Sequence, residues 1–103
     1  MRFSTFKNDH RITEQGSLLP DSYATTLADS KNVSTGSEAV QRYALPNDDP
    51  AVFVFDIKPM EQTLIKRGIV QENFGKPGGG VEVIFCVGTG PDTVSLRPQT
   101  LPA

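Results

Sequence analysis

The segment AVFVFDI at residues 51–57 constrains the fold more than any other part of this sequence. Because side chains alternate along a strand, its two phenylalanines and its isoleucine would lie on one face and its two valines on the other. Apolar side chains on both faces indicate a strand that is covered on two sides. We therefore expect residues 51–57 to form a central strand that ends at Lys58-Pro59.

The remaining segments predict an α+β fold with short helices early in the chain and mostly strands after them. Two capping boxes mark helix starts: Thr26-x-x-Asp29 opens a helix over residues 27–33, and Thr35-x-x-Glu38 opens one that stops before Pro46. Further strands are predicted at residues 22–26, 62–70 with a bulge at Gly68, 81–87 and, as an edge strand, 93–96. Residues 97–103 are expected to form a frayed tail.

Length and composition limit the chain to one small domain, residues 1–103. Its net charge of −2 argues against strong nonspecific binding to nucleic acid, which requires a basic surface. The single cysteine, Cys86, excludes a disulfide within the chain. No apolar run approaches the roughly 18 residues of a membrane span, and residues 1–10 lack the apolar stretch of a signal peptide. If the domain reaches another compartment, we expect it to do so as a C-terminal fragment of a longer polypeptide.

The most unusual local feature is FGKPGGGVEVIF at residues 74–85, where three consecutive glycines precede a strand that carries one acid, Glu82. No Gly-Lys-Ser/Thr follows the glycines, and both the P-loop and the dinucleotide-binding turn need a strand before the glycines and a helix after them. The loop is therefore either a flexible connection or a place where bare backbone lies against a ligand. Glu82, flanked by apolar residues, is correspondingly either solvated or directed into a cleft.

Other catalytic chemistry has less support in the sequence. His10 is the only histidine, and no cluster of metal-ligating residues accompanies it, so we expect no metal site. Cys86 lies in an apolar strand, where cysteines are more often inert than reactive. No G-x-S-x-G motif indicates a serine hydrolase.

Three segments occur in an order that is shared with a known family. They are HRITEQGSLLPDSYATT, then RYALP leading into AVFVFDIKP, and finally GIVQENFGKPGGGVE. Together they resemble the tuberculosis necrotizing toxin domain, an NAD⁺ glycohydrolase family. More broadly they resemble the ADP-ribosyltransferase-like toxin domains of bacterial polymorphic and contact-dependent toxins. The resemblance runs from about Arg11 to Phe85, and FGKPGGG is its most specific part.

The resemblance implies an ADP-ribosyltransferase-like split β-sheet with one or two short helices around an NAD⁺ cleft. It implies that Arg11, Tyr23 and Glu82 act on the dinucleotide, where the necrotizing toxins have Gln in place of Glu82 and transferases have Glu. The paired Glu-x-Glu motif of arginine-modifying transferases is absent, and Arg2 competes with Arg11 as the phosphate ligand. It also implies that the dinucleotide is bound by Thr25, Phe74, Gly78, Gly79 and Gly80.

The chemistry of NAD⁺ cleavage needs residues of these types. Breaking the nicotinamide–ribose bond creates an oxocarbenium-like ribose, which a nearby carboxylate stabilises. An arginine can hold the pyrophosphate, and an aromatic ring such as that of Tyr23 can stack on a flat base. In this interpretation the glycines clear space for NAD⁺ beside Glu82.

The expected function is therefore that of a toxin domain that uses NAD⁺ as its substrate, with water or a protein or nucleic-acid acceptor. It would be delivered within a larger effector, act in the cytoplasm of a target cell and have a cognate immunity protein. Two alternatives remain open. One is a small ribonuclease toxin with His10 and Glu82 as its acid–base pair and Arg11 and Thr25 on the phosphate. The other is a non-catalytic binding module whose glycine loop is only a turn.

Overall fold

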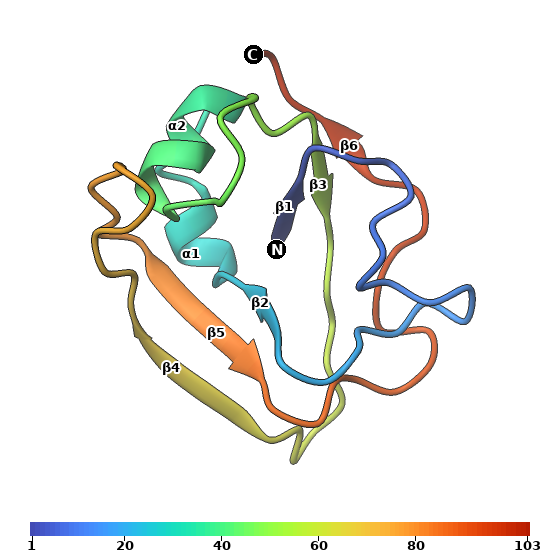
Figure 1. The fold of residues 1–103 in the computed structure, drawn as a ribbon. Coiled ribbons are helices and arrows are strands. Elements are labelled where there is room, and N and C mark those ends of the chain that lie inside the picture. The colour runs from blue at the N-terminus through green and yellow to red at the C-terminus, as the bar shows by residue number, and fades with distance from the viewer.

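Two antiparallel sheets of three strands each and two short helices make up this α+β domain, which a computed structural model describes over residues 1–103 (Figure 1). One sheet has the order β1-β3-β6 and contains β1 (Arg2–Ser4), β3 (Phe53–Phe55) and β6 (Gln99–Thr100). The other has the order β2-β5-β4 and contains β2 (Ser22–Ala24), β5 (Val81–Phe85) and β4 (Ile65–Ile69). The predicted α+β class is confirmed.

The strand expected at the centre of a sheet is central in the structure. β3 lies between β1 and β6 and is antiparallel to both, although it covers residues 53–55 and is shorter than predicted. Phe55 from this sheet packs with Val83 and Phe85 of β5 in the main core, which Leu18 and Val94 complete. Burial of these apolar side chains therefore joins the two sheets.

The second sheet places Glu82 in a regular ladder. Five consecutive pairs join β4 to β5, from Ile65 opposite Phe85 to Ile69 opposite Val81. Gly68 lies directly opposite Glu82 in this register, so the predicted bulge at Gly68 was wrong. The strand has no extra residue at Gly68. Because glycine has no side chain, no side chain lies directly opposite Glu82.

The predicted N-cap residues Thr26 and Thr35 cap the starts of the two helices, α1 (Leu27–Ser30) and α2 (Gly36–Arg42). The Thr26 hydroxyl accepts a hydrogen bond from the backbone amide of Asp29, and the Thr35 hydroxyl accepts one from that of Glu38. These contacts satisfy amides that have no partner within a helix, which is why they define where each helix begins. Neither helix is both long and apolar enough to cross a bilayer.

The end of the chain differs from the prediction. Residues 97–103 are not frayed, because β6 pairs with β3 and the Leu101 amide donates to the Val52 carbonyl. The carbonyls of Pro102 and Ala103 accept from the first amides of α2, those of Gly36 and Ser37. These amides have no acceptor inside the helix, so the C-terminal residues complete its N-terminus.

The predicted edge strand at residues 93–96 was also wrong. The segment forms no strand, and its pairing is limited to an isolated antiparallel bridge between Val94 and Ile57. Val94 is nevertheless buried in the main core, so the apolar position was recognised correctly while its secondary structure was not.

Candidate functional site

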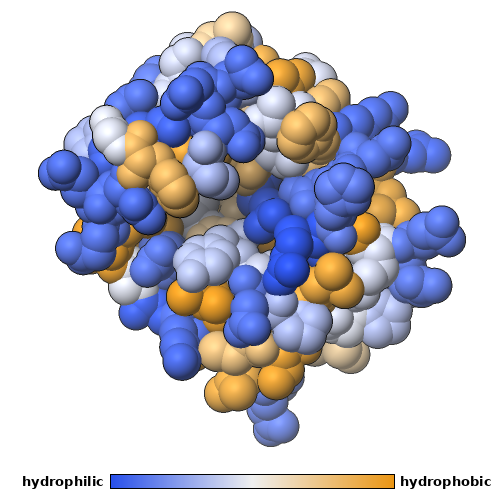
Figure 2. Space-filling view, viewed as in Figure 1, coloured by the Kyte–Doolittle hydropathy of each residue, from blue (hydrophilic) through white to orange (hydrophobic).

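A cleft of about 890 Å³ opens on the face of the molecule shown in Figure 2, where the surface is hollowed near its centre. Its walls come from both sheets: from β1 and the residues after it, and from β2 and the start of β5. The segments that follow α2 and β4, residues 43–47 and 70–74, complete the rim. This volume lies within the range of about 300–1,000 Å³ that is typical of small-molecule sites.

Five of the residues proposed from the sequence line this one cleft although they are far apart in the chain. They are Arg11, Tyr23, Thr25, Phe74 and Glu82. The competing Arg2 and the alternative acid–base residue His10 line it as well. The folded chain therefore brings together the residues of both enzymatic interpretations, and the cleft alone does not separate NAD⁺ cleavage from ribonuclease chemistry.

The glycine triplet does not line the cleft, in contrast to the expectation that it clears space for a ligand. A side chain at Gly78 would come within 2.5 Å of the Val70 carbonyl oxygen, and one at Gly80 within 2.5 Å of the Tyr43 ring. Gly79 is exposed, has a φ of 98°, and would leave an added Cβ with no neighbour within 4 Å. Gly78 and Gly80 therefore allow close packing against other parts of the same chain. Only glycine fits against the Val70 carbonyl and the Tyr43 ring.

Glu82 is the second residue of β5 and is half-buried in the cleft wall. The structure gives its carboxylate no hydrogen-bond or ion-pair partner from the protein. Its neighbour across the ladder, Gly68, has no side chain, and Oε1 of Glu82 lies 3.9 Å from the point where a Cβ would sit there. The carboxylate is therefore free to accept a hydrogen bond from a ligand or to face a positive charge.

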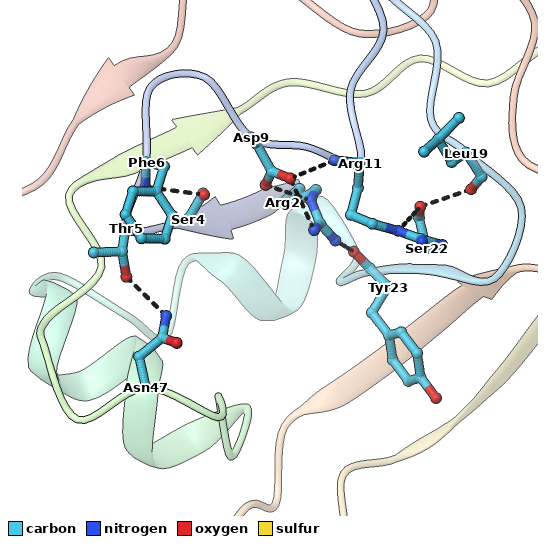
Figure 3. Close-up of polar contacts among 10 residues, drawn as sticks. All are labelled: Arg2, Ser4, Thr5, Phe6, Asp9, Arg11, Leu19, Ser22, Tyr23 and Asn47. Carbon is cyan, nitrogen blue, oxygen red and sulfur yellow. Dashed lines mark hydrogen bonds and ion pairs between the residues drawn. The ribbon is translucent and has the colours of Figure 1, made fainter.

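The two arginines of the cleft, Arg2 and Arg11, differ in the partners that their guanidinium groups have within the protein (Figure 3). Arg2 donates to both oxygens of Asp9, at 2.9 and 3.3 Å, and to the Tyr23 carbonyl at 2.7 Å. Burial disfavours the ionised form of Asp9, but the hydrogen bonds and charge of Arg2, together with hydrogen bonds from the Arg11 amide and Ser4, hold the pKa of Asp9 below its usual value. The charge of Arg2 is thus compensated within the protein.

Arg11 has no acidic partner. Its guanidinium donates to the Ser22 hydroxyl at 3.2 Å and to the Pro20 carbonyl, both of which are neutral acceptors. Nη1 of Arg11 makes no hydrogen bond within the protein. Arg11 therefore provides an uncompensated positive charge for an anionic ligand in this cleft, which favours it over Arg2 as a phosphate ligand.

Aromatic side chains stand at the rim of the cleft. Tyr23 and Phe74 are 53% and 57% exposed, and the Tyr23 ring points away from the Arg2–Asp9 pair (Figure 3). Phe6, which the sequence analysis did not single out, is 62% exposed and also lines the cleft. Exposed rings bordering a cleft can stack on a planar base. Nothing in the local sequence around Phe6 distinguishes it, because its position depends on the path of the chain after β1.

Sequence reasoning also missed a buried polar cluster behind the cleft wall. Asp29, recognised only as a capping-box residue, accepts from Arg42 at 2.7 and 3.1 Å and from the Tyr43 hydroxyl at 2.8 Å. The hydrogen bonds from Arg42 are the main reason that the pKa of Asp29 falls to about 2. Burial, together with the hydrogen bond to Asp29, raises the pKa of Tyr43 to about 12.

This cluster reaches the cleft through two of its members, Tyr43 and Thr25, which both line it. The Tyr43 ring stacks on Phe3 with the ring centroids 5.3 Å apart. The Thr25 hydroxyl faces Asp29 at 3.4 Å, so it is already occupied by the cluster. A ligand role for Thr25 would therefore compete with its contact to Asp29.

No group of three or more His, Cys, Asp or Glu side chains in the structure could hold a metal ion. Comparisons with protein-family models, with curated proteins and with solved structures found no match for this chain.

Proposed function

We propose that this domain cleaves the nicotinamide–ribose bond of NAD⁺, as a glycohydrolase or an ADP-ribosyltransferase, and that its two sheets correspond to the split sheet of ADP-ribosyltransferase-like toxins. One observation carries the proposal. The resemblance implies that Arg11, Tyr23 and Glu82 act on the dinucleotide. All three line the same cleft, and the carboxylate of Glu82 has no partner there.

The proposed role of Glu82 is electrostatic. As the nicotinamide departs, positive charge develops on the ribose, and a carboxylate that is not already paired with a cation can stabilise that charge. A half-buried position strengthens the effect because water screens the interaction less than it would at the surface. In a transferase, the same carboxylate could accept a proton from the acceptor.

Arg11 and the rim aromatics have binding roles in this proposal. The free Nη1 of Arg11 would donate to a pyrophosphate oxygen, while its other donors keep the side chain in place on Ser22 and Pro20. Tyr23 and Phe74 would stack on the flat bases at the two ends of the dinucleotide. The glycines are not part of this ligand site, since none of the three lines the cleft.

The remaining parts of the proposal come from the resemblance alone. It describes a toxin domain carried within a larger secreted or contact-delivered effector, active in the cytoplasm of the target cell and neutralised by a cognate immunity protein.

The direct test is incubation of the purified domain with NAD⁺, with free nicotinamide measured by chromatography. Parent protein should release nicotinamide, and Glu82→Ala should not, while Glu61→Gln, an exposed acid outside the cleft, should match the parent. Free ADP-ribose as the second product would identify a glycohydrolase, and ADP-ribose attached to added protein or RNA would identify a transferase. Cleavage of RNA without any release of nicotinamide would instead support the ribonuclease alternative.

Glu82→Gln refines the same assay. The change is nearly isosteric on a strand, so the variant should fold. A glycohydrolase of the necrotizing-toxin type is expected to keep cleavage, because that family carries Gln at this point. A transferase is expected to lose modification of its acceptor, since glutamine cannot act as a base.

A further inference from the structure

The segment that contains the glycine triplet is held against the end of α2 by main-chain hydrogen bonds. The Gly78 amide donates to the Gln41 carbonyl at 3.0 Å, and the Gly80 amide donates to the Arg42 carbonyl at 3.1 Å. These carbonyls belong to the last turn of the helix, where no amide of the helix donates to them. The glycines thus complete the C-terminus of α2, and the helix end in turn fixes the entry into β5.

Asp29 secures this helix end from the side of α1. Only 7% of its side chain is exposed, and its two oxygens accept from both Arg42 and Tyr43. The backbone amide of Val81, the first residue of β5, also favours the ionised carboxylate. One buried charge therefore links α1 to the last turn of α2, to whose carbonyls Gly78 and Gly80 donate.

Glu82 depends on its backbone for its position. Its carboxylate has no partner that would hold it, and the glycine opposite supplies no packing against it. A displacement of the start of β5 would therefore move the carboxylate directly. For a catalytic group, a misplacement of about 1 Å can lower the rate by about 100-fold.

We propose that Asp29 is a positioning residue for Glu82, which it keeps in the cleft by clamping residues 78–80 to the end of α2 through Arg42 and Tyr43. Asp29 does not line the cleft, so it cannot act on a ligand directly. The inference rests on the proposed function for the identity of the residue that is positioned. The clamp itself is inferred only from the hydrogen bonds of Asp29, Gly78 and Gly80, whatever the function of the domain.

The test compares Asp29→Asn, which keeps the shape and removes the charge, with Asp92→Asn, an exposed aspartate outside the cleft. Amide hydrogen exchange is followed residue by residue. In Asp29→Asn, exchange at Gly78 and Gly80 should accelerate at least about tenfold, while the β3 amides exchange as in the parent. The kcat for nicotinamide release should fall at least about tenfold with KM for NAD⁺ nearly unchanged.

Tyr43→Phe keeps the inference testable even if Asp29→Asn does not fold. It removes one hydrogen bond to Asp29 and retains the ring that packs on Phe3 and Gly80, so it should produce a smaller change of the same kind. Unchanged exchange at Gly78 and Gly80, or a uniform acceleration at every amide, would overturn the proposal. If the parent releases no nicotinamide, the proposed function fails, and the exchange measurement alone decides whether the clamp exists.

Discussion

Nη1 of Arg2 lies 2.7 Å from the carbonyl oxygen of Tyr23 and donates a hydrogen bond to it, so a side chain of β1 binds the backbone of β2 across the two sheets. The same guanidinium holds the carboxylate of Asp9, only 7% of whose side chain is exposed. Arg2 therefore shapes the cleft, whereas Arg11 keeps donors for a ligand. This difference separates the two arginines experimentally.

Arg2→Ala should destabilise the fold. It removes the contact to Tyr23 and leaves the carboxylate of Asp9 without its cation, and such losses cost about 2 kcal/mol. Urea denaturation of the parent and the variant measures the difference. Arg67→Ala, at an exposed position of β4, serves as the control and should change the free energy of unfolding little. A fully stable Arg2→Ala protein would show that Arg2 does not join the sheets.

Arg11→Ala should instead weaken binding of NAD⁺. Loss of a charge-assisted contact to the pyrophosphate costs about 1.5–3 kcal/mol, which corresponds to an increase in KM of about 10- to 150-fold. The contact is made largely in the ground state, so kcat should change less than KM. Steady-state kinetics of nicotinamide release provide both constants. If KM stays at the parental value, Arg11 is not the phosphate ligand.

Alanine at Gly79 and at Gly80 should separate backbone strain from packing, whereas Gly78, with a φ of 71°, combines both. Gly78→Ala and Gly80→Ala place a methyl group within 2.5 Å of the Val70 carbonyl and the Tyr43 ring, and should each cost about 3 kcal/mol of stability. Gly79→Ala meets no neighbour and bears only the cost of positive φ, about 1 kcal/mol. Thermal unfolding ranks the three variants.

Gly79→Ala also tests the ligand-facing interpretation of the triplet. Because Gly79 does not line the cleft, its alanine variant should keep the parental affinity for NAD⁺ and the parental rate of cleavage. Reduced affinity for NAD⁺ in a variant that still folds would show that Gly79 does lie against the ligand.

Stability should fall in acid because of Asp29. Its pKa is about 2 in the folded protein against an ordinary value of 3.8, so the folded state favours the ionised form. The resulting stabilisation, about 2 kcal/mol, is complete above about pH 4 and is lost as the pH falls through about 2. Urea denaturation between pH 2 and pH 6 should show this loss in the parent. Asp29→Asn should lack this component of the pH dependence.

Lys76→Met should loosen the rim of the cleft. The Lys76 ammonium, which is buried, donates to the Leu45 and Asn47 carbonyls at 2.9 and 3.0 Å and to Asp48 at 3.1 Å. Loss of these bonds should cost about 1–3 kcal/mol and expose the loop at residues 71–77 to proteases. Lys66→Met on the exposed strand β4 is the matched control and should be cleaved like the parent.

Features that depend on neighbours in sequence could be predicted. The helix N-caps at Thr26 and Thr35 were recognised because a helix start is decided within four residues. β3 and β5 followed from short apolar runs, although both strands are shorter than those runs. The gathering of Arg11, Tyr23 and Glu82 in one cleft was implied by the resemblance and not by any spacing.

Features that depend on distant partners could not be predicted. Lys76 is an ordinary loop residue by its sequence, yet its acceptors lie at residues 45–48. Residues 97–103 were expected to be frayed, since nothing in them shows that the first amides of α2 require acceptors. Asp29 is a capping residue by its sequence and the centre of a buried cluster by its contacts.

The sequence by itself determined the α+β class, the helix starts, the apolar strands and the backbone freedom of Gly78–Gly80, because local propensity and side-chain periodicity act over a few residues. Only the tertiary structure decided what that freedom serves. It brought Val70, Tyr43 and the end of α2 against the glycines and left the carboxylate of Glu82 unpaired in a cleft. The physical reason is that a glycine permits close approach without specifying the partner, and the partner is selected when burial of the core brings distant segments together.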